Sequence, residues 1–90
     1  MGGNTLIKMN KLEILNEVNP KALKADGWDE ALLGHVERCG QPPTACYDKQ
    51  KIIELSIKDG MSEEEAIEYF EYNINGAYVG SLTPFYLTTY

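Results

Sequence analysis

The chain has 90 residues, of which 43% are hydrophobic and 10% aromatic, and its formal net charge is −6 at pH 7. This length suits one domain with a modest core, so the composition excludes both two independent cores and a wholly disordered chain. No apolar run approaches the roughly 20 residues of a membrane-spanning helix, and no basic-then-apolar leader is found. We therefore expect a single soluble, cytoplasmic domain over residues 10–90, and a homodimer is compatible with so small a core.

The acidic excess lies entirely in the last third of the chain. Residues 1–58 carry eight acidic and eight basic side chains, whereas residues 59–90 contain six acidic residues and neither Lys nor Arg. A phosphate-binding surface needs clustered Lys and Arg, so direct nucleic-acid binding is disfavoured. Two interpretations of the acidic segment stay open. It is either a solvated helix face without function or a negative surface. Such a surface would meet a basic partner, or it would imitate nucleic acid and inhibit a host-defence or other nucleic-acid-binding enzyme.

The first predicted elements are a flexible extension over residues 1–9 and a helix that Asn10 caps and Asn19-Pro20 ends. Trp28 is expected to pack against the core behind a turn. The apolar stripe of the helix is predicted to consist of Leu12, Ile14, Leu15 and Val18.

A hairpin is predicted over residues 31–47. Imperfect alternation favours a strand over residues 31–39. The segment 40–43 is expected to be a loop, because two prolines cannot continue a β-ladder, and residues 44–47 form a short second strand. One face of the first strand is predicted to carry Leu32, Gly34 and Val36.

A pair of helices should follow the hairpin. Asp48 is a good N-cap for a helix over residues 49–59, Gly60 can close it in the left-handed conformation, and Ser62 with Glu65 forms a capping-box pattern. The second helix runs from residue 63 to at least 74. Its apolar spacing favours continuation toward residue 79, whereas Asn75-Gly76 favours an end there. Its predicted apolar stripe is Ala66, Ile67, Phe70, Ile74 and Ala77.

The predicted fold class is α+β. Residues 84–90 favour a terminal strand. Together with the hairpin 31–47, this strand forms a small antiparallel or mixed three-stranded sheet, which the helical pair covers on one face. The N-terminal helix completes the domain.

Several motifs between residues 34 and 87 form a pattern: Tyr47-Asp48, Asp59-Gly60-Met61-Ser62, Glu64-Glu65-Ala66, the segment 73–80 and Thr83-Pro84. This pattern resembles a group of small uncharacterised proteins from bacteriophages and some bacteria. The resemblance implies a phage-type accessory protein acting in the host cytoplasm, and it transfers no catalytic residue.

Catalytic and metal-binding interpretations concern the hairpin. One interpretation takes Cys39 as a nucleophile and His35 as its base. Residues i and i+4 of a strand lie roughly 13 Å apart, however, which is too far for a direct hydrogen bond. A zinc site from these two residues with Cys46 and Asp48 lacks the close cysteine pair typical of zinc. A disulfide between the cysteines is conceivable, but reduced, buried thiols are favoured. We expect no catalytic residue, no cofactor and no metal, with a small thiol- or metal-dependent enzyme as an alternative.

Protein–protein interaction is the function that the sequence favours. Tyrosine beside carboxylates suits an interface, and Tyr69 and Tyr72 fall outside the strict apolar stripe. Packing of the tyrosines in the core is the alternative. Arg38, the only arginine, is expected to form an ion pair or loop hydrogen bonds, with binding as a second role. The partner is expected to be a protein. The candidate binding residues are Glu64, Glu68, Glu71, Tyr69, Tyr72 and Arg38.

Overall fold

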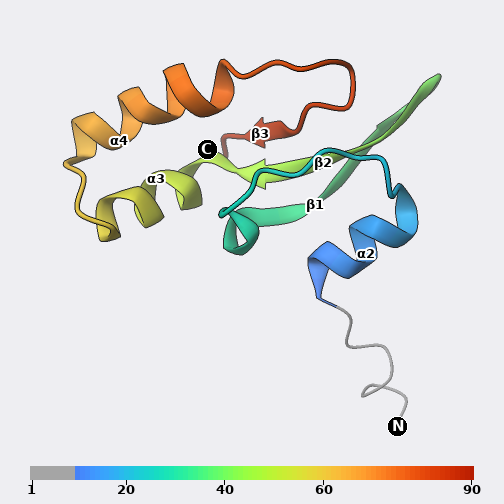
Figure 1. Cartoon of the computed structure of the whole chain (residues 1–90), viewed down its shortest axis with the longest axis horizontal. Coiled ribbons are helices and arrows are strands. Elements are labelled where there is room, and N and C mark those ends of the chain that lie inside the picture. Colours follow the sequence, from blue (N-terminus) through green and yellow to red (C-terminus); the bar gives the residue numbers. More distant parts are fainter. Residues whose placement is uncertain (1–9) are drawn as a thin grey trace, which may run out of the picture.

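The computed structural model describes residues 10–90 (Figure 1), so the extension predicted over residues 1–9 lies outside the described part. The described chain is an α+β domain, as the sequence predicts. Its elements are α2 (Lys11–Val18), the 3-10 turn η1 (Asp29–Ala31), β1 (Leu32–Arg38), β2 (Gln41–Asp48), α3 (Lys49–Lys58), α4 (Glu63–Tyr69), the π-helical turn η2 (Phe70–Asn75) and β3 (Phe85–Leu87).

The sheet is mixed, with β2 between β1 and β3. β1 and β2 form the antiparallel hairpin, whereas β3 pairs parallel to β2. A parallel pair needs a long crossover, which α3, α4 and η2 supply (Figure 1). Ala45 and Tyr47 of β2 belong to the hydrophobic cluster under the helices. We call their side of the sheet the core face and the opposite side, which carries Thr44 and Cys46, the outer face.

Pro42 and Pro43 lie inside β2, so the prediction of a loop there is wrong. Between two regular pairs of the ladder, the single residue Glu37 of β1 faces both prolines. This β-bulge accommodates them because bulged residues need not donate to the ladder. The Pro43 carbonyl accepts a hydrogen bond of 2.8 Å from the side-chain amide of Asn19, which ties the bulge to the end of α2.

A second bulge, at Leu33, changes which side chains of β1 share a face. Leu33 has no partner of its own in β2, whereas its neighbours pair with consecutive residues there. Directly opposed side chains lie on the same face, so Leu32 and His35 are on the core face while Gly34 and Val36 are on the outer face. The predicted grouping of Leu32 with the latter two is therefore wrong, because alternation breaks at a bulge.

Local capping determines where the helices begin, and these predictions are confirmed. The side chains of Asn10 and Ser62 each form a capping box with the glutamate three residues later. Asp48 accepts hydrogen bonds from two amides of the first turn of α3. Gly60 has φ +114° at the α3–α4 junction, as expected for a residue that closes a helix.

The end of the last helix differs from the prediction. Beyond α4 the chain widens into η2, which ends at Asn75 with Gly76 as its cap, so the expected continuation to Val79 is wrong. The amide of Val79 instead donates to the Thr83 hydroxyl at 2.9 Å. The chain after Gly76 must turn back so that β3 can pair with β2. The helix therefore ends, although the apolar spacing of the sequence would allow it to continue.

The buried stripes are narrower than periodicity indicates. In α4 and η2 the stripe comprises Ala66, Phe70 and Ile74, whereas Ile67 is 41% exposed and Ala77 is also exposed. In α2, Leu15 is buried and Leu12 half-buried, while Ile14 and Val18 are exposed.

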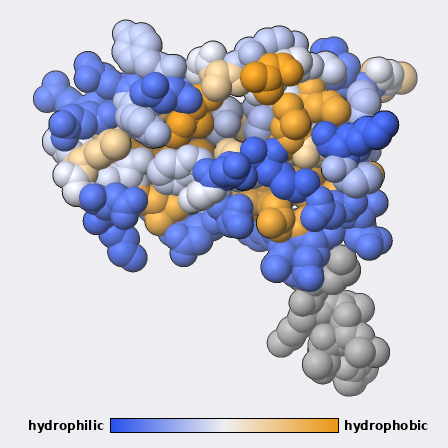
Figure 2. All heavy atoms as spheres, viewed as in Figure 1, coloured by the Kyte–Doolittle hydropathy of each residue, from blue (hydrophilic) through white to orange (hydrophobic). Residues whose placement is uncertain are grey.

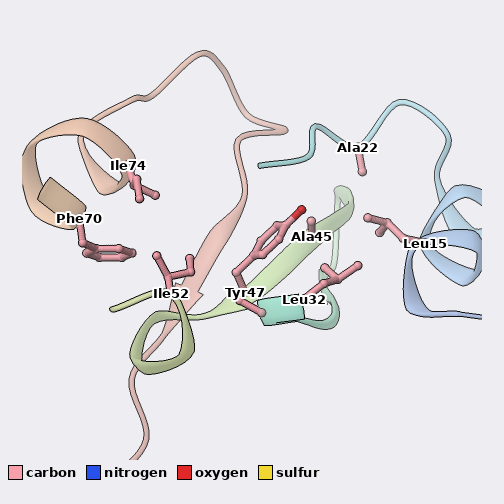
Figure 3. Close-up of a cluster of buried hydrophobic side chains, with 9 residues drawn as sticks. Leu15, Ala22, Leu32, Ala45, Tyr47, Ile52, Phe70 and Ile74 are labelled. Atoms are coloured by element: carbon pink, nitrogen blue, oxygen red, sulfur yellow. The ribbon is translucent and has the colours of Figure 1, made fainter. Parts of the chain in front are cut away.

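Tyr47 lies at the centre of the core. Figure 3 shows it between Leu15 and Ala22 on one side and Phe70 on the other. Its hydroxyl accepts a hydrogen bond of 2.9 Å from the amide of Ala25, which fastens the segment before η1 onto the sheet. Burial raises the pKa of Tyr47, so the hydroxyl stays protonated over the neutral range.

Candidate interaction surface

Two aromatic side chains from distant parts of the chain line a continuous depression. Trp28 precedes η1 and packs half-buried against the core, and Tyr69 is the last residue of α4. Both line two adjoining hollows of about 380 and 420 Å³, which also share Asp26. We call this depression the Trp28–Tyr69 groove. Its aromatic walls offer apolar contact area to a ligand.

Carboxylates dominate the charge of the groove. Asp26, Glu30 and Asp59 line the second hollow, where Lys58 is the only basic side chain. Lys24 lines the first hollow, and its ammonium lies 3.4 Å from the Ala22 carbonyl. The second hollow therefore carries a negative charge beside two aromatic rings.

Of the three predicted acidic residues of the last helix, only two lie together on an exposed face. Glu64 and Glu68 lie four residues apart on one face of α4 and are exposed. Tyr72 is 81% exposed on η2, whereas Tyr69 is 39% exposed and lines the groove. Figure 2 shows hydrophilic side chains over the region of α3 and α4. Glu64 and Glu68 do not line the groove, so they form a separate pair of exposed carboxylates on α4.

Glu71 is not a free surface carboxylate. Its Oε2 lies 2.9 Å from the Lys49 ammonium, and its Oε1 accepts a hydrogen bond of 3.3 Å from Asn75. The Lys49 bond, followed by that of Asn75, lowers the pKa of Glu71. Lys49 also lies 5.3 Å from the centroid of the Phe70 ring. Glu71 therefore joins η2 to the start of α3, where Lys49 balances its negative charge.

We expect Glu71 to titrate below the ordinary pKa of a glutamate, and Lys49→Met to raise its pKa. A lowered pKa in the folded state means that the stabilising contribution is present above the unfolded value and is lost as pH falls through the folded value. Carboxyl-detected NMR titration of both proteins measures this directly. Lys51→Met is the matched control, and an equal shift in that variant would contradict the assignment.

Arg38 lies far from the acidic residues with which it is grouped as a predicted binding residue. It is exposed at the end of β1 and lines a separate hollow of about 320 Å³ with Val36, Thr44 and Phe85. No ion pair or side-chain hydrogen bond joins Arg38 to another residue within 10–90, so the expected ion pair is not formed. The six predicted binding residues thus belong to different surfaces.

The hairpin does not assemble a thiol site. Both cysteines are free, and Cys39 is exposed, which contradicts the expectation that both are buried. His35 Nε2 lies 2.7 Å from Glu37 Oε2. Burial, followed by Asp48, raises the pKa of the Cys46 thiol and so disfavours the reactive thiolate. Within residues 10–90, no group of three or more His, Cys, Asp or Glu side chains is arranged to hold a metal ion.

Comparison with known proteins gives no match: no family model, no curated protein and no solved structure is significantly similar to the chain. Among the described helices, none is both long and apolar enough to span a bilayer. The resemblance to phage proteins therefore stays a prediction, and the function rests on the geometry of the surface.

Trp28 and its neighbouring carboxylates are absent from the predicted site. The signal for them is present in the sequence, because the only tryptophan of the chain stands within the acidic run from Asp26 to Glu30. Tyr69 is predicted as an interface residue, but its proximity to Trp28 depends on how α4 packs beside the segment before η1.

Proposed function

We propose that this chain is a non-enzymatic interaction protein that binds a basic segment of a protein partner in the Trp28–Tyr69 groove. The observation that carries the proposal is the placement of two accessible aromatic rings beside the carboxylates of Asp26, Glu30 and Asp59. A phage-type accessory role in the host cytoplasm is the biological setting that fits the sequence resemblance.

The chemistry of the groove favours an arginine-bearing ligand. A guanidinium stacks on aromatic faces and donates to carboxylates at the same time, and its aliphatic stem packs on apolar surface. A partner with an acidic ligand segment would meet like charge in the second hollow. Glu64 and Glu68 add long-range attraction, which speeds association more than it strengthens the complex.

Intrinsic fluorescence tests the proposal with model peptides in place of the partner. Trp28 is the only tryptophan, so its emission reports directly on the groove. An Arg-Gly repeat peptide is expected to change the emission in a saturable way, and a Gln-Gly repeat of equal length is expected to have no effect. Tyr69→Ala should weaken binding by about tenfold, or about 1.4 kcal/mol, because it removes one aromatic wall.

Tyr90→Ala is the matched control, because Tyr90 is fully exposed and does not line the groove. Equal affinity of the Tyr69 and Tyr90 variants, with both folded, would remove the groove from the proposal. Glu64→Lys with Glu68→Lys should weaken binding at low salt and change it little at high salt, since exposed charges are screened.

Imitation of nucleic acid is the alternative function. It rests on the exposed carboxylates of Glu64 and Glu68 rather than on the aromatic walls. A mimic should displace DNA or RNA from a nucleic-acid-binding target and should tolerate Tyr69→Ala, whereas a groove-binding interaction protein should show the reverse pattern.

A further inference from the structure

The first hollow of the Trp28–Tyr69 groove is more apolar than the second. Leu23 and Val79 line it together with the shared aromatic rings, and these two side chains are 39% and 70% exposed. Ile74 also lines it and belongs to the hydrophobic cluster of the core. The first hollow therefore offers apolar surface that is accessible to a ligand at Val79 and continuous with the core at Ile74.

Two connections that are distant in the sequence build the first hollow. Leu23 lies before η1, whereas Val79 lies in the connection from η2 to β3 (Figure 1). The amide of Leu23 donates to the Leu82 carbonyl at 3.4 Å, which joins the two connections. The Thr83 hydroxyl accepts from the Val79 amide at 2.9 Å and donates to the Gly80 carbonyl at 2.7 Å. These bonds hold the backbone at Val79 in place, so the hollow is formed before a ligand binds.

The two hollows also differ in charge. Among the described residues, those that bring charge to the first hollow are Lys24 and Asp26, which are of opposite sign. In the second hollow, the carboxylates of Asp26, Glu30 and Asp59 outnumber the single ammonium of Lys58. A second basic side chain of a ligand would meet Lys24 in the first hollow. Charge therefore favours a basic side chain in the second hollow and an uncharged one in the first.

On the basis of the proposed function, we propose further that the partner segment carries an apolar side chain two residues from its arginine. The arginine occupies the second hollow and the apolar side chain occupies the first. The hollows share Asp26, Trp28 and Tyr69, so their occupants must be close neighbours. In an extended segment, residues two apart point to the same side at about 3.3 Å per residue, whereas adjacent residues point to opposite sides.

The size of the first hollow suits one such side chain. Its volume of about 380 Å³ is at the lower end of the roughly 300–1,000 Å³ of ligand pockets. A leucine that is partly buried there should strengthen binding by about tenfold, because its apolar area is removed from water.

Three model peptides of equal length test this pattern through the emission of Trp28, the only tryptophan. They are repeats of Arg-Gly-Leu-Gly, of Arg-Leu-Gly-Gly and of Arg-Gly-Gly-Gly. The first peptide has leucine two residues from arginine in both directions, so the result does not depend on which way the peptide lies. It should bind about tenfold more tightly than the third. The second should bind like the third, since its leucine points away from the first hollow when arginine fills the second.

Val79→Asn removes an apolar wall of the first hollow without adding charge, and its exposed position leaves the fold intact. This variant should lose most of the tenfold preference for the first peptide over the third. Ile67→Asn is the matched control, because Ile67 is exposed on α4 and lines neither hollow. The preference should persist in that variant.

Equal binding of the three peptides by the wild type would overturn this pattern and leave the proposed function intact, whereas no binding of any of them would overturn both. An equal gain from the Arg-Leu-Gly-Gly repeat would overturn the two-residue spacing. A preference that survives Val79→Asn, or that is lost in Ile67→Asn, would contradict the placement of leucine in the first hollow.

Discussion

Phe70→Ala is expected to unfold most of the protein at physiological temperature. Phe70 is 1% exposed, and its ring packs edge-on against Tyr86 with centroids 5.2 Å apart. Removing a buried phenylalanine costs about 3–5 kcal/mol. Roughly 5 kcal/mol is the total stability expected at the lower end for a domain of this size. The substitution also removes the ring against which the Lys49 ammonium lies.

Phe85→Ala is the matched comparison, because Phe85 is the other phenylalanine of the chain and is half exposed. Urea unfolding of both variants at low protein concentration should give a large loss of stability for Phe70 and less than about 1 kcal/mol for Phe85. Similar midpoints for the two variants would mean that the core is not centred where the structure places it.

The α3–α4 junction is expected to be the second most sensitive element. Gly60→Val forces a β-branched residue into the left-handed region at about 1–2 kcal/mol. Ser62→Ala removes the acceptor of the Glu65 amide, a hydrogen bond of 3.1 Å, at about 0.5–2 kcal/mol. The double variant should therefore lose a large share of the total stability, which thermal unfolding measures.

Gly34→Val separates backbone strain from crowding. A Cβ at Gly34 or at Gly60 meets no atom within 4 Å, but only Gly60 has a positive φ. Gly60→Val alone should therefore lower the melting temperature far more than Gly34→Val. Comparable melting temperatures, or a junction double variant as stable as the wild type, would contradict the helix boundaries at this junction.

The sequence alone was sufficient for the helix starts and for the fold class. The caps at Asn10, Asp48 and Ser62 were all predicted, and so was the positive φ of Gly60. Each of these features depends on atoms within about four residues along the chain, so local chemistry determines them. The sequence leaves open whether the sheet is antiparallel or mixed, and the parallel pairing of β3 with β2 decides it.

Only the tertiary structure decided the features that depend on a distant partner. The prolines could enter β2 because a bulge opposite Glu37 releases them from the ladder, and Leu33 shifts the faces of β1 for a similar reason.

The predicted binding residues lie on different surfaces for the same reason: long-range packing determines their neighbours. The sequence groups Tyr69 and Arg38 as binding residues. In the fold, Tyr69 lies beside Trp28, whereas Arg38 lines a separate hollow at the hairpin end of the sheet. Glu71 forms an ion pair with Lys49, which is 22 residues away along the chain, because the crossover brings η2 to the start of α3. Local spacing determined which residues cap the helices, whereas packing between distant segments determined which side chains are buried and which of them meet.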